Sequence, residues 1–144
     1  MDQNALAADR LTYSGVVQSW HCDHMGHMNV TWYVAKFDEA TWSFFARLGL
    51  TRSYMQENRC GMAAVEQNLK YLRELYAGDV VEIRTRMLEL RERVVRFRHE
   101  MTLAGTGTLA ATADMTTVHL DTVRRKAMAF PAAVREAAER LSGQ

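Results

Sequence analysis

The sequence predicts an α+β fold in which a curved antiparallel sheet of about five strands wraps around one long helix. Two observations carry this prediction. A helical pattern that is apolar on most sides covers residues 29–48, and a series of long β-type segments follows it. A helix of this kind has to be buried, and a curved sheet is the economical surface that buries it. The 144 residues, 48% of them hydrophobic, predict a single domain over residues 1–144.

Composition and charge exclude several classes of protein. The sequence has no run of 18 apolar residues, so we expect no membrane-spanning helix and no membrane partner. The first ten residues lack the basic and apolar regions of a secretory signal, and two cysteines make no disulfide framework. We therefore expect a cytoplasmic location. A net charge of +1 gives no general attraction to nucleic acid.

The first two elements are a strand and the long helix. Residues 11–20 are rich in β-favouring residues and predict a strand. After a loop with one glycine and three histidines, the helix begins near Asn29 and ends at Leu48, before Gly49, a residue type that often ends helices. Its apolar positions recur every three or four residues: Val30, Tyr33, Phe37, Ala40, Phe44 and Leu48.

Four more strands and a short helix complete the prediction. We expect the strands over residues 62–73, 81–87, 95–103 and 108–120. The middle two alternate apolar with charged residues, as in a hairpin with one buried and one solvated face. Pro131 suits the first turn of a terminal helix. A sheet of this size leaves unpaired edges, so we expect a homodimer or a homotetramer.

Chemically capable side chains crowd into the loop before the helix: His21, Cys22, Asp23, His24 and His27. A metal site is one interpretation, but no second ligand cluster follows downstream, and we expect no metal. Cys22 with a histidine base is another, although sequence neighbours usually point in different directions. In the third, Asp23 acts as base or nucleophile beside a helix N-terminus that binds a developing oxyanion. Purely structural turn and cap hydrogen bonds by Asp23 and Asn29 are the alternative to all three.

The stretch from Trp20 to Trp42 resembles the D-x-x-G-x-x-x-x-x-x-Y…E-A signature of hotdog-fold acyl-CoA thioesterases, the relatives of 4-hydroxybenzoyl-CoA thioesterase. The matching residues are Asp23, Gly26, Tyr33, Glu39 and Ala40. Residues 64–83 resemble that family's second strand, turn and third strand, and residues 120–131 resemble its closing segment. The resemblance therefore covers nearly the whole chain, in the right order.

The resemblance implies the hotdog fold, a sheet continuous across two subunits, and an active site between them. Asp23 would be the catalytic carboxylate, attacking the thioester carbonyl or activating a water. A backbone N–H near Val30 would polarise the carbonyl oxygen, and no cofactor would be needed. The expected activity is hydrolysis of an acyl-CoA to free acid and CoA.

Three other activities on this fold stay open at this point. His27 and Asn29 form a G-H-x-N pattern that is also similar to acyl-carrier-protein thioesterases. That branch carries asparagine where Met25 and Val30 stand here, which favours CoA thioesters and leaves His27 as a possible second catalytic group. A non-hydrolytic module that binds acyl-CoA or acyl-carrier protein is the second alternative, and a hydratase is the third.

Further candidate residues lie outside the loop. Glu39 falls within a second apolar stripe formed by Trp32, Ala35, Trp42 and Ala46, so we expect it to be buried with a structural partner, with catalysis as the rival role. Tyr33 either packs in the core or lines an acyl pocket.

Two groups of arginines have different expected roles. Arg124 and Arg125 follow the last strand, and arginine matches the phosphates of CoA. The hairpin cations Arg84, Arg86, Arg96 and Arg98 lie among acidic residues, which predicts ion pairs on a solvated face. We see no aromatic residues on that face, so we expect no nucleic-acid partner.

Overall fold

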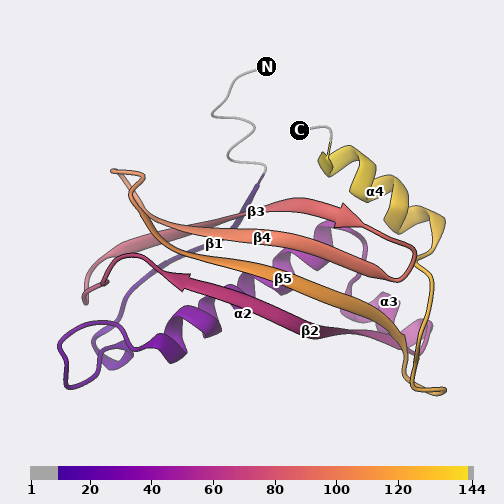
Figure 1. Cartoon of the computed structure of the whole chain (residues 1–144), viewed down its shortest axis with the longest axis horizontal. Helices are drawn as coiled ribbons and strands as arrows, with labels where there is room; N and C mark the ends of the chain where they lie inside the picture. The colour runs from indigo at the N-terminus through magenta and orange to yellow at the C-terminus, as the bar shows by residue number, and fades with distance from the viewer. Residues whose placement is uncertain (1–9, 143–144) are drawn as a thin grey trace.

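The computed structural model describes residues 10–142. Five long strands and one short strand form a single antiparallel sheet in the order β1-β3-β4-β5-β2, with β6 paired to β5. The sheet curves, and the long helix α2 runs across one of its faces (Figure 1). The predicted α+β architecture is therefore confirmed.

The observed elements agree with the prediction except at three places. Their bounds are β1 Leu11–Val16, the short 3₁₀ helix η1 Ser19–His21, α2 Val30–Arg47, α3 Arg52–Glu57, β2 Cys60–Tyr71, β3 Val80–Leu90, β4 Val94–Leu103, β5 Leu109–Asp121, β6 Lys126–Ala127 and α4 Ala132–Ser142. The first strand ends earlier than expected because the chain turns into η1. Helix α3 and strand β6 were not predicted.

The core lies between α2 and the concave face of the sheet. The helix buries the predicted apolar face, including Tyr33, Phe37 and Phe44. The ring of Phe44 lies 4.8 Å from that of Phe97 on β4, which is fully buried. Burying each side chain of this size contributes about 1.5–3 kcal/mol to folding, so this contact positions the helix on the sheet.

A buried polar network joins α2 to three strands. His99 of β4 is fully buried, with Nε2 2.8 Å from Thr41 Oγ1 of α2 and Nδ1 2.7 Å from Thr85 Oγ1 of β3. Thr85 in turn lies 2.8 Å from Thr12 Oγ1 of β1. Burial lowers the pKa of His99 to about 3, so the imidazole is neutral at physiological pH. The network fixes where the helix sits along the sheet.

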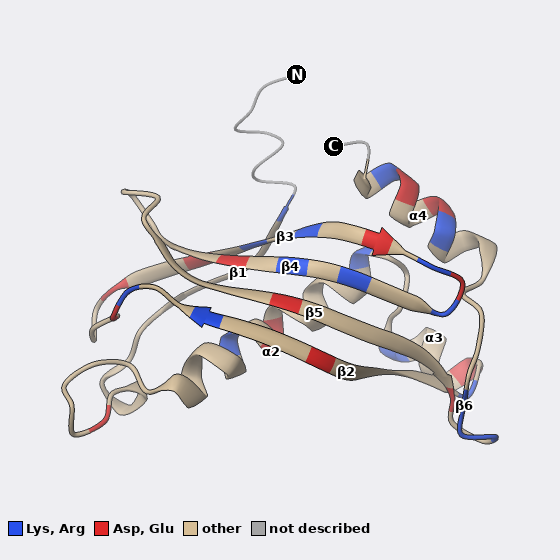
Figure 2. Cartoon of the chain, viewed as in Figure 1, with Lys and Arg blue, Asp and Glu red and all other residues tan. Residues whose placement is uncertain are grey.

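The opposite face of the sheet carries the predicted ion pairs. Basic and acidic residues lie on neighbouring strands β3, β4 and β5 (Figure 2). Arg98 donates two hydrogen bonds to Asp114, at 2.5 and 2.9 Å, and Arg86 lies 3.5 Å from Glu100. This face is therefore solvated and internally charge-balanced, as expected.

The outer face of α2 differs from the prediction. Glu39 is exposed, Trp42 is 49% exposed, and Trp32 is only partly buried. The sheet covers one side of the helix only, so the second apolar stripe faces outward in a single chain. The expectation that Glu39 is buried with a structural partner is therefore wrong.

Two further findings concern the cysteines and the length and hydropathy of the helices. Both cysteines, Cys22 and Cys60, are free. Across residues 10–142, no helix is both long and apolar enough to cross a membrane.

Candidate active site

The loop before α2 is a tight turn that presents Asp23. The Gly26 N–H donates to the Asp23 carbonyl at 3.0 Å, and the Asp23 N–H donates to the His27 carbonyl at 3.2 Å. Gly26 has φ +88°, which side chains rarely adopt, and this explains glycine at that position. Gly26 therefore shapes the turn.

The Asp23 carboxylate is held by two hydrogen-bond donors. The Asn29 side-chain amide donates to Oδ2 at 2.8 Å, and the Met25 N–H donates to Oδ1 at 2.9 Å. The Asn29 bond, followed by the Met25 bond, lowers the pKa of Asp23 below its usual value. At neutral pH the group is therefore an ionised carboxylate, fit to act as base or nucleophile.

The start of α2 provides a free backbone donor next to Asn29. The Asn29 side-chain oxygen accepts the Thr31 N–H at 2.9 Å, and its carbonyl accepts the Trp32 N–H at 3.0 Å. The Val30 N–H has no acceptor among residues 10–142. A free N–H at the positive end of a helix can stabilise a developing oxyanion.

A cavity of about 210 Å³ opens beside Val30. Its lining comes from the loop, the first turn of α2, the last residue of β2 and the segment that follows it: His27, Met28, Val30, Tyr33, Tyr71, Leu72, Arg73 and Glu74. The two parts are joined by the Met28 N–H, which donates to the Leu75 carbonyl at 2.7 Å. The residues after β2 were missed by sequence reasoning, because their pattern alone says nothing about which loop they meet.

Tyr33 lies between the core and the cavity. It is buried in the core and also lines the cavity. Its hydroxyl donates to the Arg73 carbonyl at 2.9 Å, and its ring meets that of Tyr71 edge-on at 5.2 Å. Burial raises the pKa of Tyr33, so the hydroxyl stays protonated and is committed to Arg73.

His27 lines the cavity. Its Nε2 lies 3.7 Å from Glu74 Oε1, and its Nδ1 lies 3.4 Å from the Met28 carbonyl. The structure therefore brings His27 and Val30 to one cavity, next to Asp23 and Asn29.

Arg124 and Arg125 lie far from Asp23 within one chain. They occupy the turn before β6, beside the Cys60 end of β2, since Cys60 pairs with Asp121. The loop that carries Asp23 is at the other end of β2 (Figures 1 and 2). At roughly 3.3 Å per residue along β2, the separation is about 35 Å. One chain alone does not bring these arginines to the carboxylate.

The structure does not assemble the other catalytic groups considered for the loop. Cys22 Sγ donates to the Gln18 carbonyl at 3.8 Å, and His21 Nδ1 accepts the Gln18 N–H at 2.9 Å, so the two side chains do not form a nucleophile–base pair. Within residues 10–142, no group of three or more His, Cys, Asp or Glu side chains is placed to hold a metal ion. Asp23 is thus the best-placed reactive group in the loop.

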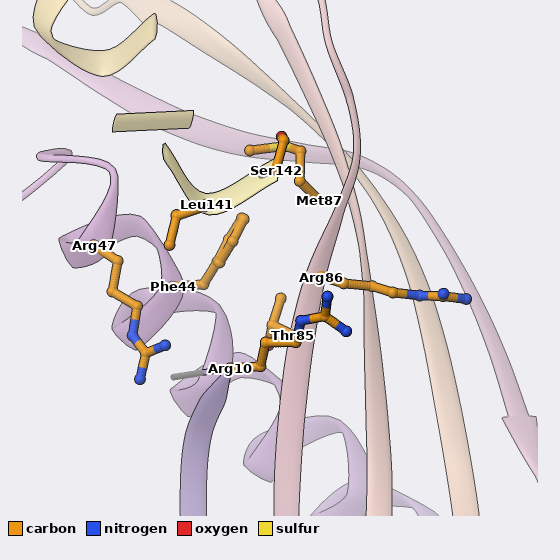
Figure 3. A pocket seen from close by; sticks show the side chains of 8 residues that line it. All are labelled: Arg10, Phe44, Arg47, Thr85, Arg86, Met87, Leu141 and Ser142. Carbon is orange, nitrogen blue, oxygen red and sulfur yellow. The ribbon is translucent and has the colours of Figure 1, made fainter. Parts of the chain in front are cut away.

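A separate cavity of about 220 Å³ lies at the other end of α2 (Figure 3). Phe44, Arg47 and the end of α4 contribute to its lining. Phe44 is 14 residues beyond Val30, which is about 20 Å along a helix. Arg47 donates to the Leu11 carbonyl, and the Arg86 side chain extends away from the cavity toward Glu100. This cavity is therefore too far from Asp23 to be part of the same site.

Comparisons with known proteins identify proteins that resemble this chain in sequence. A family model described as a thioesterase-like superfamily matches residues 16–138. The chain is 28% identical over 135 residues to an L-carnitine dehydrogenase/betainyl-CoA thioesterase of Agrobacterium fabrum, covering 94% of this chain and 27% of that protein. It is 27% identical to a betainyl-CoA thioesterase of Pseudomonas aeruginosa, covering 76% of this chain and 69% of that one. The chain thus spans about a quarter of the length of the Agrobacterium protein.

Solved structures share the same fold. A Staphylococcus aureus protein in complex with CoA superposes with a TM-score of 0.87 at 22% identity, over 92% of this chain and 84% of the other. At that identity the likeness shows the fold alone. It confirms the hotdog-like arrangement of a curled antiparallel sheet with a long helix packed against it.

Proposed function

Because this chain belongs to the thioesterase-like superfamily, whose members include hotdog-fold acyl-CoA thioester hydrolases, we propose that it hydrolyses an acyl-CoA to a free acid and CoA with Asp23 as catalytic residue. The observation that carries the proposal is one arrangement. An ionised Asp23 is hydrogen-bonded to the N-cap residue Asn29, the Val30 N–H at the helix start is free, and Val30 lines a cavity that can hold an acyl group.

Two routes use these groups. Asp23 either attacks the carbonyl carbon directly, forming an anhydride that water then opens, or takes a proton from a water that attacks. In both routes the carbonyl oxygen becomes an oxyanion that accepts a hydrogen bond from the Val30 N–H. The C–S bond then breaks, and the departing CoA thiolate takes up a proton. The Val30 bond strengthens as charge develops on the oxygen, which is where it lowers the barrier.

Neighbouring residues position these groups. Asn29 orients the Asp23 carboxylate and caps α2, so one side chain fixes both the carboxylate and the helix terminus. Gly26 allows the turn, and Tyr33 and His27 line the acyl cavity. A second catalytic role for His27 is not supported by any contact with Asp23.

We further propose that the site is completed by a second copy of the chain. Strand β2 is an edge of the sheet, and its exposed residues include Val65 and Tyr71. Antiparallel pairing of two β2 strands would place the Cys60 end of one beside the Tyr71 end of the other. Arg124 and Arg125 of the partner subunit would then approach the Asp23 site, where they can bind CoA phosphates. The assembly is a homodimer or a homotetramer.

The acyl cavity supports a proposal about substrate class. Two aromatic rings, of Tyr33 and Tyr71, and the Glu74 carboxylate line it. Aromatic faces and a carboxylate together favour a quaternary ammonium group. The two relatives reported above are named betainyl-CoA thioesterases. We propose that the acyl group carries a trimethylammonium.

The test is a thiol-release assay on a panel of acyl-CoA esters that includes betainyl-CoA and 3,3-dimethylbutanoyl-CoA, its uncharged isostere. The proposed activity predicts CoA release from at least one ester, and the substrate proposal predicts a preference of at least tenfold in kcat/KM for betainyl-CoA. Binding without thiol release from any ester would instead support a non-hydrolytic module. Hydrolysis with equal preference would contradict only the substrate proposal.

A further inference from the structure

A third cavity, of about 420 Å³, lies between β1, η1 and α2. Its size is within the range of small-molecule sites. It shares no lining residue with the cavity beside Val30, so nothing in the proposed hydrolysis uses it. Four of its lining residues carry ionisable groups: Tyr13, His21, Lys36 and Glu39.

Lys36 is a buried amine at this cavity. The residue is only 3% exposed. Its Nζ donates to the Tyr13 hydroxyl at 2.8 Å and lies 5.1 Å from the centre of the Tyr13 ring. No carboxylate of residues 10–142 forms an ion pair with it. A buried ammonium without an anion is unfavourable. An anionic group bound in the cavity would therefore be stabilised by Lys36.

His21 adds a second donor. The residue is 8% exposed, and its Nδ1 accepts the Gln18 N–H at 2.9 Å, which leaves the ring proton on Nε2. Burial, and then the charge of Lys36, lower the pKa of His21, so the ring is neutral at physiological pH. Among the described residues, none accepts a hydrogen bond from Nε2.

The walls of the cavity are aromatic and its remaining charge is acidic. The Trp32 ring lies 4.4 Å from that of His21, and the Trp20 ring lies 5.4 Å from it on the exposed side. These surfaces suit a flat apolar group. Glu39 is exposed and also lines the cavity, so it repels a ligand with two negative charges more strongly than a ligand with one.

From this arrangement we propose that the cavity binds a small monocarboxylate with a compact apolar body. The carboxylate accepts hydrogen bonds from Lys36 and His21, and the body packs against Trp20 and Trp32. Glu39 selects single over double negative charge. A ligand bound to His21 is also linked to the start of α2, because the His21 carbonyl accepts the Asn29 N–H at 2.9 Å.

The experiment is isothermal titration calorimetry on the whole chain without substrate, so its result is independent of any hydrolase activity. Benzoate is the probe, benzamide its uncharged isostere, and fully ionised phenylphosphonate the dianion. The proposal predicts that benzoate binds at least tenfold more tightly than either. No detectable benzoate binding, or equal binding of benzamide, would overturn it.

Two variants test the assigned residues. Lys36→Met is expected to weaken benzoate binding at least tenfold, while Asp38→Asn, an exposed neighbour on α2 outside the cavity, leaves it unchanged. Glu39→Gln, a surface change that should not affect folding, is expected to narrow the preference for benzoate over phenylphosphonate at least threefold. If Lys36→Met fails to fold by circular dichroism, the Glu39→Gln result decides. Unchanged selectivity there would refute the assignment.

Discussion

Asn29 lowers the pKa of Asp23 more than any other single residue does. Its amide is the largest cause of the lowered pKa of that carboxyl, while the Met25 N–H contributes less. A hydrogen bond to the charged form stabilises that form. Since general bases and nucleophiles act in the ionised state, the proposed mechanism predicts that Asn29 extends the pH range of activity downward.

Replacing Asn29 by serine tests this effect. Serine keeps the ability to cap α2 but lacks the side-chain amide that reaches Asp23. We expect the pKa of Asp23 to rise toward its usual value, so activity is lost at a higher pH than in the wild type. The measurement is kcat/KM against pH, whose acid limb reports the free enzyme. An acid limb that stays in place or moves to lower pH would contradict the assignment.

The buried network around His99 is the main polar link between α2 and the sheet. Thr41→Val keeps the shape of the side chain but removes the group 2.8 Å from His99 Nε2. An unsatisfied buried polar group costs about 1–3 kcal/mol, and we expect a loss of that size in the free energy of unfolding measured with urea. Thr31→Val, at an exposed position on the same helix, is the control and should change stability much less.

The same histidine predicts how stability depends on pH. Its folded pKa of about 3 lies below the unfolded value near 6.5, so the unfolded chain binds the extra proton between these values. Stability therefore falls as pH drops through this window, by at most roughly 1.4 kcal/mol per pH unit from this group. Urea unfolding between pH 4 and 8 should show a smaller slope in His99→Gln. An identical slope in both proteins would show that His99 is not responsible.

Sequence periodicity predicted the long elements because each is amphipathic over many residues. The turns of α2 place Tyr33, Phe37 and Phe44 on one face, and no other structure does so at that spacing. Helix α3 has only six residues and buries none of them, so it leaves no apolar stripe to detect. The stripe that contains Trp32 and Trp42 was wrongly expected to be buried within the chain. An apolar pattern predicts that a surface is covered but does not say whether the covering surface belongs to the same chain.

The candidate site was predictable where its residues are local in sequence. Asp23 and Asn29 meet through one loop, and a carboxylate before a helix start is visible in the sequence. The contributions of Tyr71 and Glu74 depend on the register of β2 with β5 and on the Met28–Leu75 bond. The burial of Lys36 could not be predicted, because a lysine in a helix that is otherwise apolar ordinarily extends its amine to solvent.

At the scale of the whole molecule, we expect the chain to be a dimer or a multiple of one. Light scattering at micromolar concentration should give about 33 kDa, twice the chain mass of 16.4 kDa, or a multiple of that. The physical reason is the exposed β2 edge together with the separation of Asp23 from Arg124 and Arg125. A fully active species with the mass of one chain would contradict the shared site.

Mixing two inactive variants tests the shared site itself. One variant carries Asp23→Asn and the other Arg125→Ala. If the partner subunit's Arg125 serves each Asp23, a mixed dimer holds one site with both residues intact and regains part of the activity. Zero activity after verified subunit exchange would rule out this role for Arg125 and leave dimerisation itself untouched.

The central claim is that Asp23 performs the chemistry, and the most direct measurement is the kcat of Asp23→Asn on the best acyl-CoA substrate. The substitution keeps the size of the side chain and removes its charge. We expect kcat to fall by about 10²–10⁴-fold with an unchanged circular dichroism spectrum, while Glu57→Gln, an exposed carboxylate on α3, retains wild-type activity. An Asp23→Asn protein that keeps more than half of the wild-type kcat would show that another group carries the reaction.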